Sequence, residues 1–192
     1  MRRLLRLCVG VALTVCLGMH NLSASAASAD VKTPTLSQSD EGLLLTSYFA
    51  LTLSPALTDA IDHGIPLAFQ MESEIKRSRW YWTDEIVYKA RIDRRLTYNA
   101  LVRSYRVSED QSWRNFVNLS DALNYIARPA VWRVPSGQLK PGEPIDVAIR
   151  FRLDPTFLPK PFQVVSFGDR DWRLDSDWRA FRLTVPTVAG GK

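Results

Sequence analysis

The chain has 192 residues, with 25 basic and 20 acidic side chains, two histidines and two cysteines. A chain of this length can bury enough surface to form one domain with its own hydrophobic core. Both cysteines, Cys8 and Cys16, precede residue 26, so the remainder cannot form a disulfide, and His63 is its one histidine. With so few nitrogen and sulfur ligands a zinc site is not expected, and neither a metal nor another cofactor is predicted.

Residues 1–26 are predicted to be a secretory signal peptide. Three arginines lie among the first six residues, and an apolar run of 13 residues follows from Leu7 to Met19. Ala24–Ala26 has the small residues after which signal peptidase cuts, and Ala27–Ala29 is the alternative site. The apolar run is too short to span the roughly 30 Å core of a bilayer. We therefore expect a periplasmic protein with no transmembrane segment once the signal is removed.

The signal segment also accounts for most of the positive charge. It holds three of the 25 basic residues, and no acidic residue precedes Asp30. After it, 22 basic and 20 acidic residues remain, which is a net charge of +2. Such a small excess does not indicate a nucleic-acid partner.

The chain after the signal is expected to form a single domain. Residues 27–41 are small and polar and are predicted to be a linker, residues 42–187 a single β-rich domain, and residues 188–192 a tail. The domain begins with a strand, because the apolar residues between Leu43 and Leu53 lie at alternating positions. Ser54 and Pro55 then predict the start of a short helix, and Gly64 its end.

Further strands are predicted in the middle of the chain. Between residues 67 and 76, apolar side chains alternate with polar ones, which predicts a strand with one solvated face. Its polar positions are Gln70, Glu72, Glu74 and Lys76. Residues 86–93 alternate in the same way, and residues 96–107 are rich in strand-forming side chains. One long bent strand and two separate strands are both consistent with this pattern.

A second short helix is predicted after Asn118, because apolar residues recur on one helical face until Pro129. Seven of the eleven prolines lie between residues 129 and 161, which indicates loops and sheet edges. Within this region residues 145–153 alternate strictly and predict the clearest strand, and a last short strand ends at Val185. Many strands, two short helices and no regular strand–helix alternation predict a mainly β (α+β) fold. It is expected to be an antiparallel sheet or a β-sandwich with two short helices.

Few side chains are suited to catalysis. His63 follows the first helix and is expected to interact with its last carbonyl groups rather than to act as a base. A glycosidase pair could be built from neighbouring acids, but their separation and burial are not visible in a sequence. These acids are Glu72, Glu74, Asp84 and Glu85. No acid–base pair stands out, so the chain is predicted not to be an enzyme.

A six-residue pattern occurs twice near the C-terminus, at Asp169–Arg173 and Asp175–Arg179. It departs from an EF-hand calcium loop, since Leu174 stands where that loop needs glycine. We expect the aspartates to cap turns and to pair with nearby arginines, with Trp172 and Trp178 packed inward.

The segment RSRWYWTDE, residues 77–85, contains the candidate binding residues. Extending the strand alternation places Trp80 and Trp82 on the solvated face, where two indole rings would form a flat platform for a sugar ring or a partner loop. A bulge near Ser78 would bury both tryptophans and expose the arginines instead. Packing and a binding platform are both consistent with the sequence. The candidate binding residues are Arg77, Arg79, Trp80, Tyr81 and Trp82.

Four segments are similar to one exported family of proteobacteria. They are RSRWYWTDE, RRLTYNALVRSYRVS, NLSDAL and LPKPFQ. The chain therefore resembles a family defined by a domain of unknown function, whose members are often labelled proline-rich signal peptide proteins. The resemblance covers residues 41–185 and implies no activity, ligand or catalytic residue. Members are often encoded beside a membrane sensor kinase of the nitrogen-regulation type, which implies a partner in the cell envelope.

Three hypotheses follow for the function. The leading one is an exported periplasmic module that binds an envelope protein, such as a sensor kinase, without chemistry of its own. The alternative is a glycan- or peptidoglycan-binding module that uses Trp80 and Trp82. A small acid-dependent hydrolase is the third.

Overall fold

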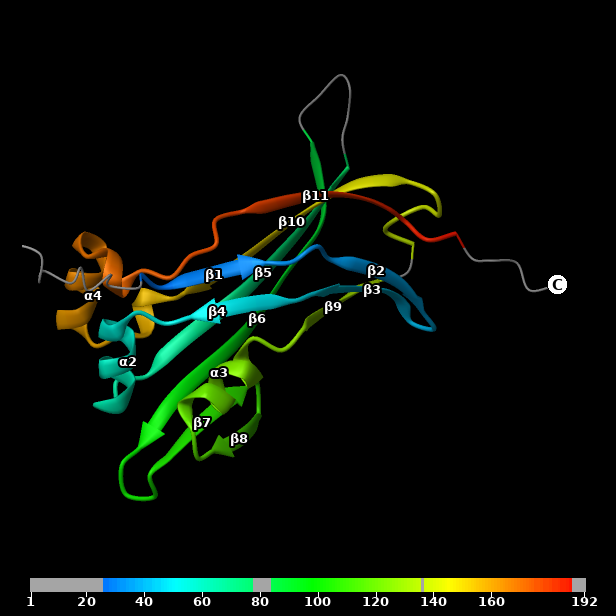
Figure 1. Ribbon diagram of the computed structural model, residues 1–192. Helices are drawn as coiled ribbons and strands as arrows, with labels where there is room; N and C mark the ends of the chain where they lie inside the picture. The colour runs from blue at the N-terminus through cyan, green and yellow to red at the C-terminus, as the bar shows by residue number, and fades with distance from the viewer. Residues whose placement is uncertain (1–25, 78–83, 136, 188–192) are drawn as a thin grey trace, which may run out of the picture.

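The computed structural model describes residues 26–77, 84–135 and 137–187, which form two layers of antiparallel β-sheet with short helices (Figure 1). The larger layer is a six-stranded sheet with the strand order β11–β10–β5–β6–β7–β8. Its strands are β5 (Leu67–Arg77), β6 (Glu85–Asn99), β7 (Ser104–Glu109), β8 (Ser112–Phe116), β10 (Pro144–Leu153) and β11 (Arg179–Thr184). Each strand runs antiparallel to its neighbours.

The smaller layer crosses one face of this sheet (Figure 1). It consists of a ribbon of β1 and β4 and a three-stranded sheet with the order β2–β3–β9. Its strands are β1 (Ser28–Val31), β2 (Thr35–Ser39), β3 (Gly42–Ser47), β4 (Phe49–Thr52) and β9 (Ala130–Pro135). β4 continues β3 beyond Tyr48, whose carbonyl oxygen accepts a hydrogen bond of 2.9 Å from the N–H of Lys32. The β1–β4 ribbon and the three-stranded sheet are therefore continuous with each other and form one layer.

The hydrophobic core lies between the two layers. Every second residue of β10 from Ile145 to Leu153 is buried, which is the pattern of a strand with one face against a core. The ring centroid of Phe151 on β10 lies 5.2 Å from that of Phe49 on β4 and 5.8 Å from that of Phe69 on β5. This aromatic cluster joins the layers and stabilises their contact through burial and ring packing.

Short helices lie beside the sheets. They are α2 (Pro55–Asp62), α3 (Leu119–Ile126) and α4 (Lys160–Gly168), with the 3₁₀ turns η1 (Pro155–Phe157) and η2 (Arg170–Trp172). α2 begins as predicted, since the Ser54 hydroxyl accepts a hydrogen bond of 3.2 Å from the N–H of Leu57. Gly64 follows α2 with a φ of 82°, which is readily accessible to glycine. In Figure 1, α2 and α4 lie at one end of the large sheet, while α3 packs on β7 and β8.

The predicted fold class is confirmed, because antiparallel sheets dominate and the helices are short. The two predicted helices correspond to α2 and α3, whereas α4 has no counterpart among the predicted elements. Residues 27–41, predicted to be a linker, instead form β1 and β2, which pair with β4 and β3. Between residues 85 and 109 the chain forms two strands, β6 and β7, joined by a turn. The predicted signal up to residue 25 and the tail at 188–192 lie outside the described residues.

The polar face of β5 is less solvated than predicted. Gln70 is 2% exposed and Glu74 is 9% exposed. Gln70 donates a hydrogen bond of 2.6 Å to the carboxylate of Asp154, and the Lys89 ammonium donates one of 2.8 Å to Glu74. Both side chains are thus held by neighbouring polar groups and shielded from solvent. The alternation in the sequence identifies the two faces of β5, but it does not show how exposed the polar face is.

A buried arginine fixes α3 to the large sheet. Arg94 on β6 is 2% exposed, and its Nη1 donates to the carbonyl oxygens of Ile126 at 2.6 Å and Arg128 at 2.8 Å. Its Nε donates to the Glu109 carboxylate on β7 at 2.7 Å. The carbonyl end of a helix carries partial negative charge, which favours a cation there. Arg94 therefore connects β6, β7 and the C-terminal end of α3.

Both charges of this pair are compensated. Burial lowers the pKa of Arg94, and its hydrogen bond to Glu109 offsets this in part. Burial also raises the pKa of Glu109, but the hydrogen bonds from Arg94 and Arg128 outweigh it and hold that pKa below the usual range. Without Glu109, Arg94 would be a buried charge with no carboxylate partner, whereas without Arg94 the Glu109 carboxylate would keep Arg128 and the carbonyl groups at the end of α3 would lose their donor.

We expect Arg94→Ala to lower the free energy of unfolding by about 3–5 kcal/mol, because the carbonyl oxygens of Ile126 and Arg128 lose their donor and Glu109 keeps only one of its two arginine partners. The control is Arg91→Ala on the same strand, since the Arg91 side chain is 55% exposed and pairs with Asp93. Loss of such a surface pair is expected to change the free energy by less than about 1 kcal/mol. Urea unfolding followed by circular dichroism measures both, and equal effects would contradict the role assigned to Arg94.

Candidate functional site

The structure describes one of the five candidate binding residues. Arg77 is the last residue of β5. The other four, Arg79, Trp80, Tyr81 and Trp82, lie outside the described residues. The prediction that the two tryptophans form a platform therefore stays a prediction.

The register of β5 shifts shortly before this segment. Its pairing with β6 is regular from Leu67 to Ile75 and changes between Ile75 and Lys76. An irregularity of the kind expected near Ser78 therefore occurs earlier along the strand. The shift places Arg77 opposite Glu85.

Arg77 joins three segments of the chain. Its Nε pairs with the carboxylate of Glu143, which precedes β10. Its Nη1 donates to Glu85 at 3.1 Å, and its Nη2 donates to the carbonyl oxygen of Gln138 at 3.1 Å. The hydrogen bond from Arg77 holds the pKa of Glu143 below its usual range. Most of the donors that a ligand would use are therefore engaged within the chain.

We expect Arg77→Ala to lower the free energy of unfolding at pH 7 by about 1–2 kcal/mol, because hydrogen bonds to a charged group are lost at a partly exposed site. A carboxyl group with a lowered folded-state pKa contributes stability above its unfolded pKa, and this is lost as the pH falls through the folded pKa. The difference between the two proteins should therefore shrink below about pH 4.

The matched control for this measurement is Arg133→Ala. Arg133 pairs with Glu41 at 2.8 Å, but both side chains are 76% exposed. Its loss is expected to have no measurable effect. Urea titrations across the pH range provide the readout. A pH-independent loss of stability in Arg77→Ala would argue against the Glu143 contact as its cause.

His63 occupies the position predicted for it. It is the C-cap of α2, with its Nδ1 2.8 Å from the carbonyl oxygen of Asp59. This hydrogen bond, together with the charge of the Asp59 carboxylate, raises the pKa of His63. A cation at the C-terminal end of a helix is favoured by the helix dipole.

The aspartates of the C-terminal repeat cap turns, as predicted. Asp169 accepts a hydrogen bond of 2.9 Å from the N–H of Asp171, and Asp175 accepts one of 2.9 Å from the N–H of Asp177. The ion-pair partner of Asp175 is Arg150 on β10 rather than an arginine of the repeat.

The two tryptophans of the repeat differ. Trp172 is half-buried and stacks on Phe162, with ring centroids 5.1 Å apart. Trp178 is 39% exposed. The expectation that both pack inward is therefore correct for Trp172 and wrong for Trp178.

Three of the four acids considered for catalysis, Glu72, Glu74 and Glu85, lie in ion pairs. Glu72 lies 3.2 Å from Arg152, and Glu74 lies 2.8 Å from Lys89. The hydrogen bond from Lys89 lowers the pKa of Glu74. A general acid at neutral pH needs a raised pKa, so this shift is in the opposite direction.

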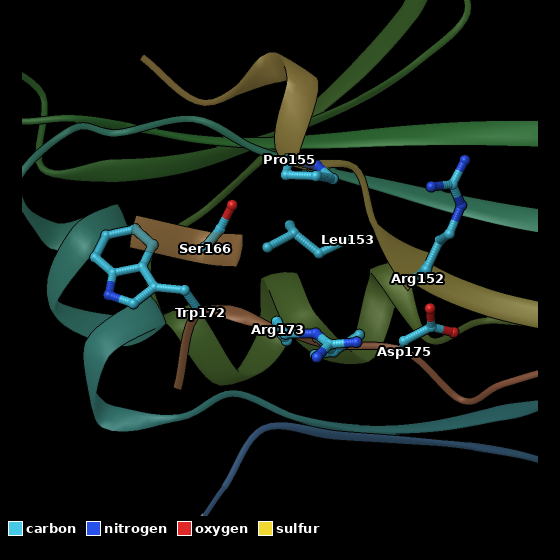
Figure 2. Close-up of a pocket in the computed structure, with 8 residues that line it drawn as sticks. Arg152, Leu153, Pro155, Ser166, Trp172, Arg173 and Asp175 are labelled. Atoms are coloured by element: carbon cyan, nitrogen blue, oxygen red, sulfur yellow. The ribbon is translucent and has the colours of Figure 1, made fainter. Parts of the chain in front are cut away.

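A cavity of about 300 Å³ opens beside the end of β10, next to α4 and η2 (Figure 2). Leu153 lies at its centre, Trp172 forms one side, and Arg152 and Asp175 lie on the opposite side. Trp172 and Leu153 supply apolar surface, and two arginines supply positive charge. This combination suits a small ligand that has both an apolar face and an anionic group.

The charges around this cavity are not equally available. Arg152 donates to Glu72 at 3.2 Å, and Asp175 is paired with Arg150. Arg173 has no carboxylate partner in the part of the chain that the structure describes. Arg173 is therefore the lining group that can pair with an anion at least cost to the fold.

A second candidate site is the β8 edge, which we define as Arg106, Trp113, Arg114 and Asn115. Trp113 is 61% exposed, and the Arg106 guanidinium lies 4.7 Å from its ring centroid. Arg114 points to the other face of the sheet and lies over the Tyr125 ring at 5.1 Å. Within residues 26–77, 84–135 and 137–187 neither arginine pairs with a carboxylate. Both guanidinium groups lie over aromatic rings, and Arg106 also donates a hydrogen bond of 3.3 Å to the Asn115 side chain.

An apolar hairpin tip, defined as Leu101, Val102 and Val117, adjoins the β8 edge (Figure 1). Leu101 is 96% exposed and Val102 is 66% exposed in the turn between β6 and β7. Tyr105 pairs with Phe116, which brings Val117, 79% exposed, to the same end of the sheet. Three exposed aliphatic side chains thus lie at the end of the sheet where β8 finishes, while Trp113 lies near the start of β8, beside the turn from β7.

The base of this hairpin is tied down. The rings of Tyr98 and Tyr105 lie 4.8 Å apart, and the Tyr105 hydroxyl donates to the Asp62 carboxylate on α2 at 2.6 Å. Burial and this hydrogen bond raise the pKa of Tyr105 to about 12. The phenol therefore stays protonated and keeps the hairpin attached to α2.

The β8 edge is not among the sites proposed from the sequence. The only sequence feature that could have predicted β8 is the two-residue turn at Asp110 and Gln111. This turn joins residues 104–109 and 112–116, which pair as strands. β8 has mostly exposed side chains on both faces, so it lacks the apolar alternation that identifies a half-buried strand.

The fold and these surfaces define a class of protein: a two-layer antiparallel β domain with an aromatic and arginine-rich edge. The chain belongs to the family described as Domain of unknown function (DUF4390), whose family model matches residues 26–182. This confirms the resemblance seen in the sequence, and the match includes the segment that forms β1 and β2. Comparisons with curated proteins and with solved structures found no match.

Among residues 26–77, 84–135 and 137–187, no helix is long and apolar enough to cross a membrane. In the same residues, no group of three or more histidine, cysteine, aspartate or glutamate side chains is placed to hold a metal ion.

Proposed function

We propose that the chain is a non-enzymatic periplasmic module that docks on another protein of the cell envelope, such as the extracytoplasmic part of a sensor kinase. The observation that carries this proposal is the joint exposure of the β8 edge and the hairpin tip at one end of the molecule. Tryptophan and arginine are the residues most enriched at the centres of protein interfaces. The exposed aliphatic side chains of the hairpin tip, at the far end of β8, add apolar area that a partner would remove from water.

The periplasmic location rests on the N-terminal segment. Its arginines, apolar run and small residues have the order of a secretory signal. A sensor kinase is named as the partner only because of the family resemblance. Any envelope protein that binds the β8 edge would be consistent with the proposed function.

A site-specific cross-linking experiment in cells tests this function. A photoreactive amino acid replaces Trp113 or Leu101 in the full chain, and Val131 serves as the control because it is 44% exposed on β9, in the other layer. We expect discrete cross-linked species at positions 113 and 101 and none at 131. Combining Arg106→Glu with Arg114→Glu should abolish them, whereas Arg133→Glu should not. The same species at position 131, or none at any position, would refute the proposed docking surface.

A second function is favoured by the cavity beside Trp172. An indole ring next to Arg173 suits a sugar ring that carries a carboxylate, as peptidoglycan fragments do. This version of the glycan hypothesis uses described residues in place of Trp80 and Trp82.

Calorimetric titration with soluble peptidoglycan fragments tests the second function. Arg173→Ala should weaken binding about tenfold or more, because a charge-assisted hydrogen bond is lost. Arg170→Ala is the matched control, since Arg170 lies in the same turn but does not line the cavity. Absence of heat across the fragments, or equal loss in both variants, would eliminate this function.

A further inference from the structure

β8 is an open edge of the large sheet. In the described chain it pairs with β7 and with no other strand. Glu109 and Ser112 close the two-residue turn, in which Asp110 has a φ of 50°. The residues that close such a turn exchange both backbone hydrogen bonds, and hydrogen-bonded and non-hydrogen-bonded pairs then alternate along the strands. The backbone groups of Arg114 therefore point to β7.

The same alternation directs the backbone N–H and C=O groups of Trp113 and Asn115 away from β7. They stand in the plane of the sheet, between side chains that project to its two faces. The neighbouring α3 packs against the face of β7 and β8 and not along this edge, as the contact of Tyr125 with Phe116 and Arg114 shows. An added strand can therefore reach these backbone groups.

The opposite edge of the sheet differs in its charges. On β11, Arg182 lies 3.1 Å from Asp146, and Arg179 lies 4.0 Å from Asp30. The arginines of β11 are thus neutralised by the chain itself. The arginines of the β8 edge contact aromatic rings instead, so their pairing with carboxylates is left to a partner.

These charges also decide what can pair with β8. If two copies of the chain paired antiparallel about the middle of β8, Arg114 would face Arg114 of the second copy. Like charges directly opposite each other destabilise a strand pair, whereas opposite charges stabilise it. A strand with acidic side chains would meet Arg114 on one face and Arg106 on the other. An apolar side chain beside them would pack on Trp113.

We propose that β8 accepts an extended acidic segment of a partner protein as an additional antiparallel or parallel strand. This inference rests on the proposed function and specifies how the partner is recognised. Backbone hydrogen bonds to Trp113 and Asn115 supply the attachment, and the two arginines select acidic side chains.

The probe is a short peptide with blocked ends that repeats Glu-Glu-Val-Val, which places glutamate on both faces of an extended strand, and the control is the same peptide with lysine in place of glutamate. Nuclear magnetic resonance of the folded domain follows the amide groups during titration. We expect the acidic peptide to shift the Trp113 and Asn115 amides and to slow their hydrogen exchange, and the basic peptide to do neither. Shifts elsewhere without change at β8 would overturn the proposal.

Two variants separate backbone pairing from side-chain contacts. Asn115→Ala loses the side-chain hydrogen bond with Arg106 but keeps the outward N–H. Asn115→Pro loses that N–H as well, while the ladder to β7 is kept. We expect the proline variant to bind the acidic peptide about tenfold or more weakly than the alanine variant, at an unchanged melting temperature. Equal binding by the two variants would exclude strand addition.

If the proline variant does not fold, a charge-reversed variant tests the same binding mode. The protein with Arg106→Glu and Arg114→Glu should lose affinity for the acidic peptide and bind the basic one.

Cross-linking from position 101 distinguishes the two proposals. Cross-links that persist in folded Asn115→Pro would leave the proposed function standing and overturn strand addition, whereas their absence from the unmodified chain would refute the function. A cross-linked species of twice the chain's mass would assign the edge to a second copy and contradict the acidic partner.

Discussion

The guanidinium of Arg94 makes the contacts on which the β7–β8 end of the large sheet depends. It lies within the core, where an isolated charge would be strongly unfavourable, and it is stabilised by Glu109 and by the carbonyl groups at the end of α3. This places α3 against β7 and β8. Tyr125 of α3 can then lie under Arg114 and Arg128, and Phe116 of β8 packs on the same ring. One buried charge therefore positions the ring over which Arg114 of the β8 edge lies.

The alternation of apolar and polar residues was sufficient to predict a strand wherever the strand has one apolar and one polar face. β10 follows it from Ile145 to Leu153, and the cap at Ser54 located α2. The alternation was insufficient to predict β1, β2 and β8, which are short and mostly exposed. β2 and β8 pair with β3 and β7 across two-residue turns, and β1 pairs with the more distant β4. These pairings stabilise the strands, although their sequences lack the apolar alternation that would identify them. Arg94 is a further case, because an arginine on an apolar face can be recognised only once its partners are known.

The candidate site was predicted only in part. Arg77 proved to be engaged by Glu143, Glu85 and the Gln138 carbonyl, which depends on segments distant in sequence. The aromatic and arginine character expected of a binding surface recurs instead at Arg106 and Trp113. Sequence composition indicated the type of side chain, whereas exposure and the lack of a carboxylate partner could be read only from the arrangement of strands.

Amide hydrogen exchange of the free domain distinguishes an ordered, unpaired β8 edge from one that is covered or unfolded. Groups bonded within a ladder exchange slowly, while ordered groups that face water exchange rapidly. We expect slow exchange at Arg114 and Phe116 and rapid exchange at Trp113 and Asn115. Slow exchange at all four amides would mean that the edge is already covered, and rapid exchange at all four would mean that β8 is not a stable strand. Either result would contradict the account.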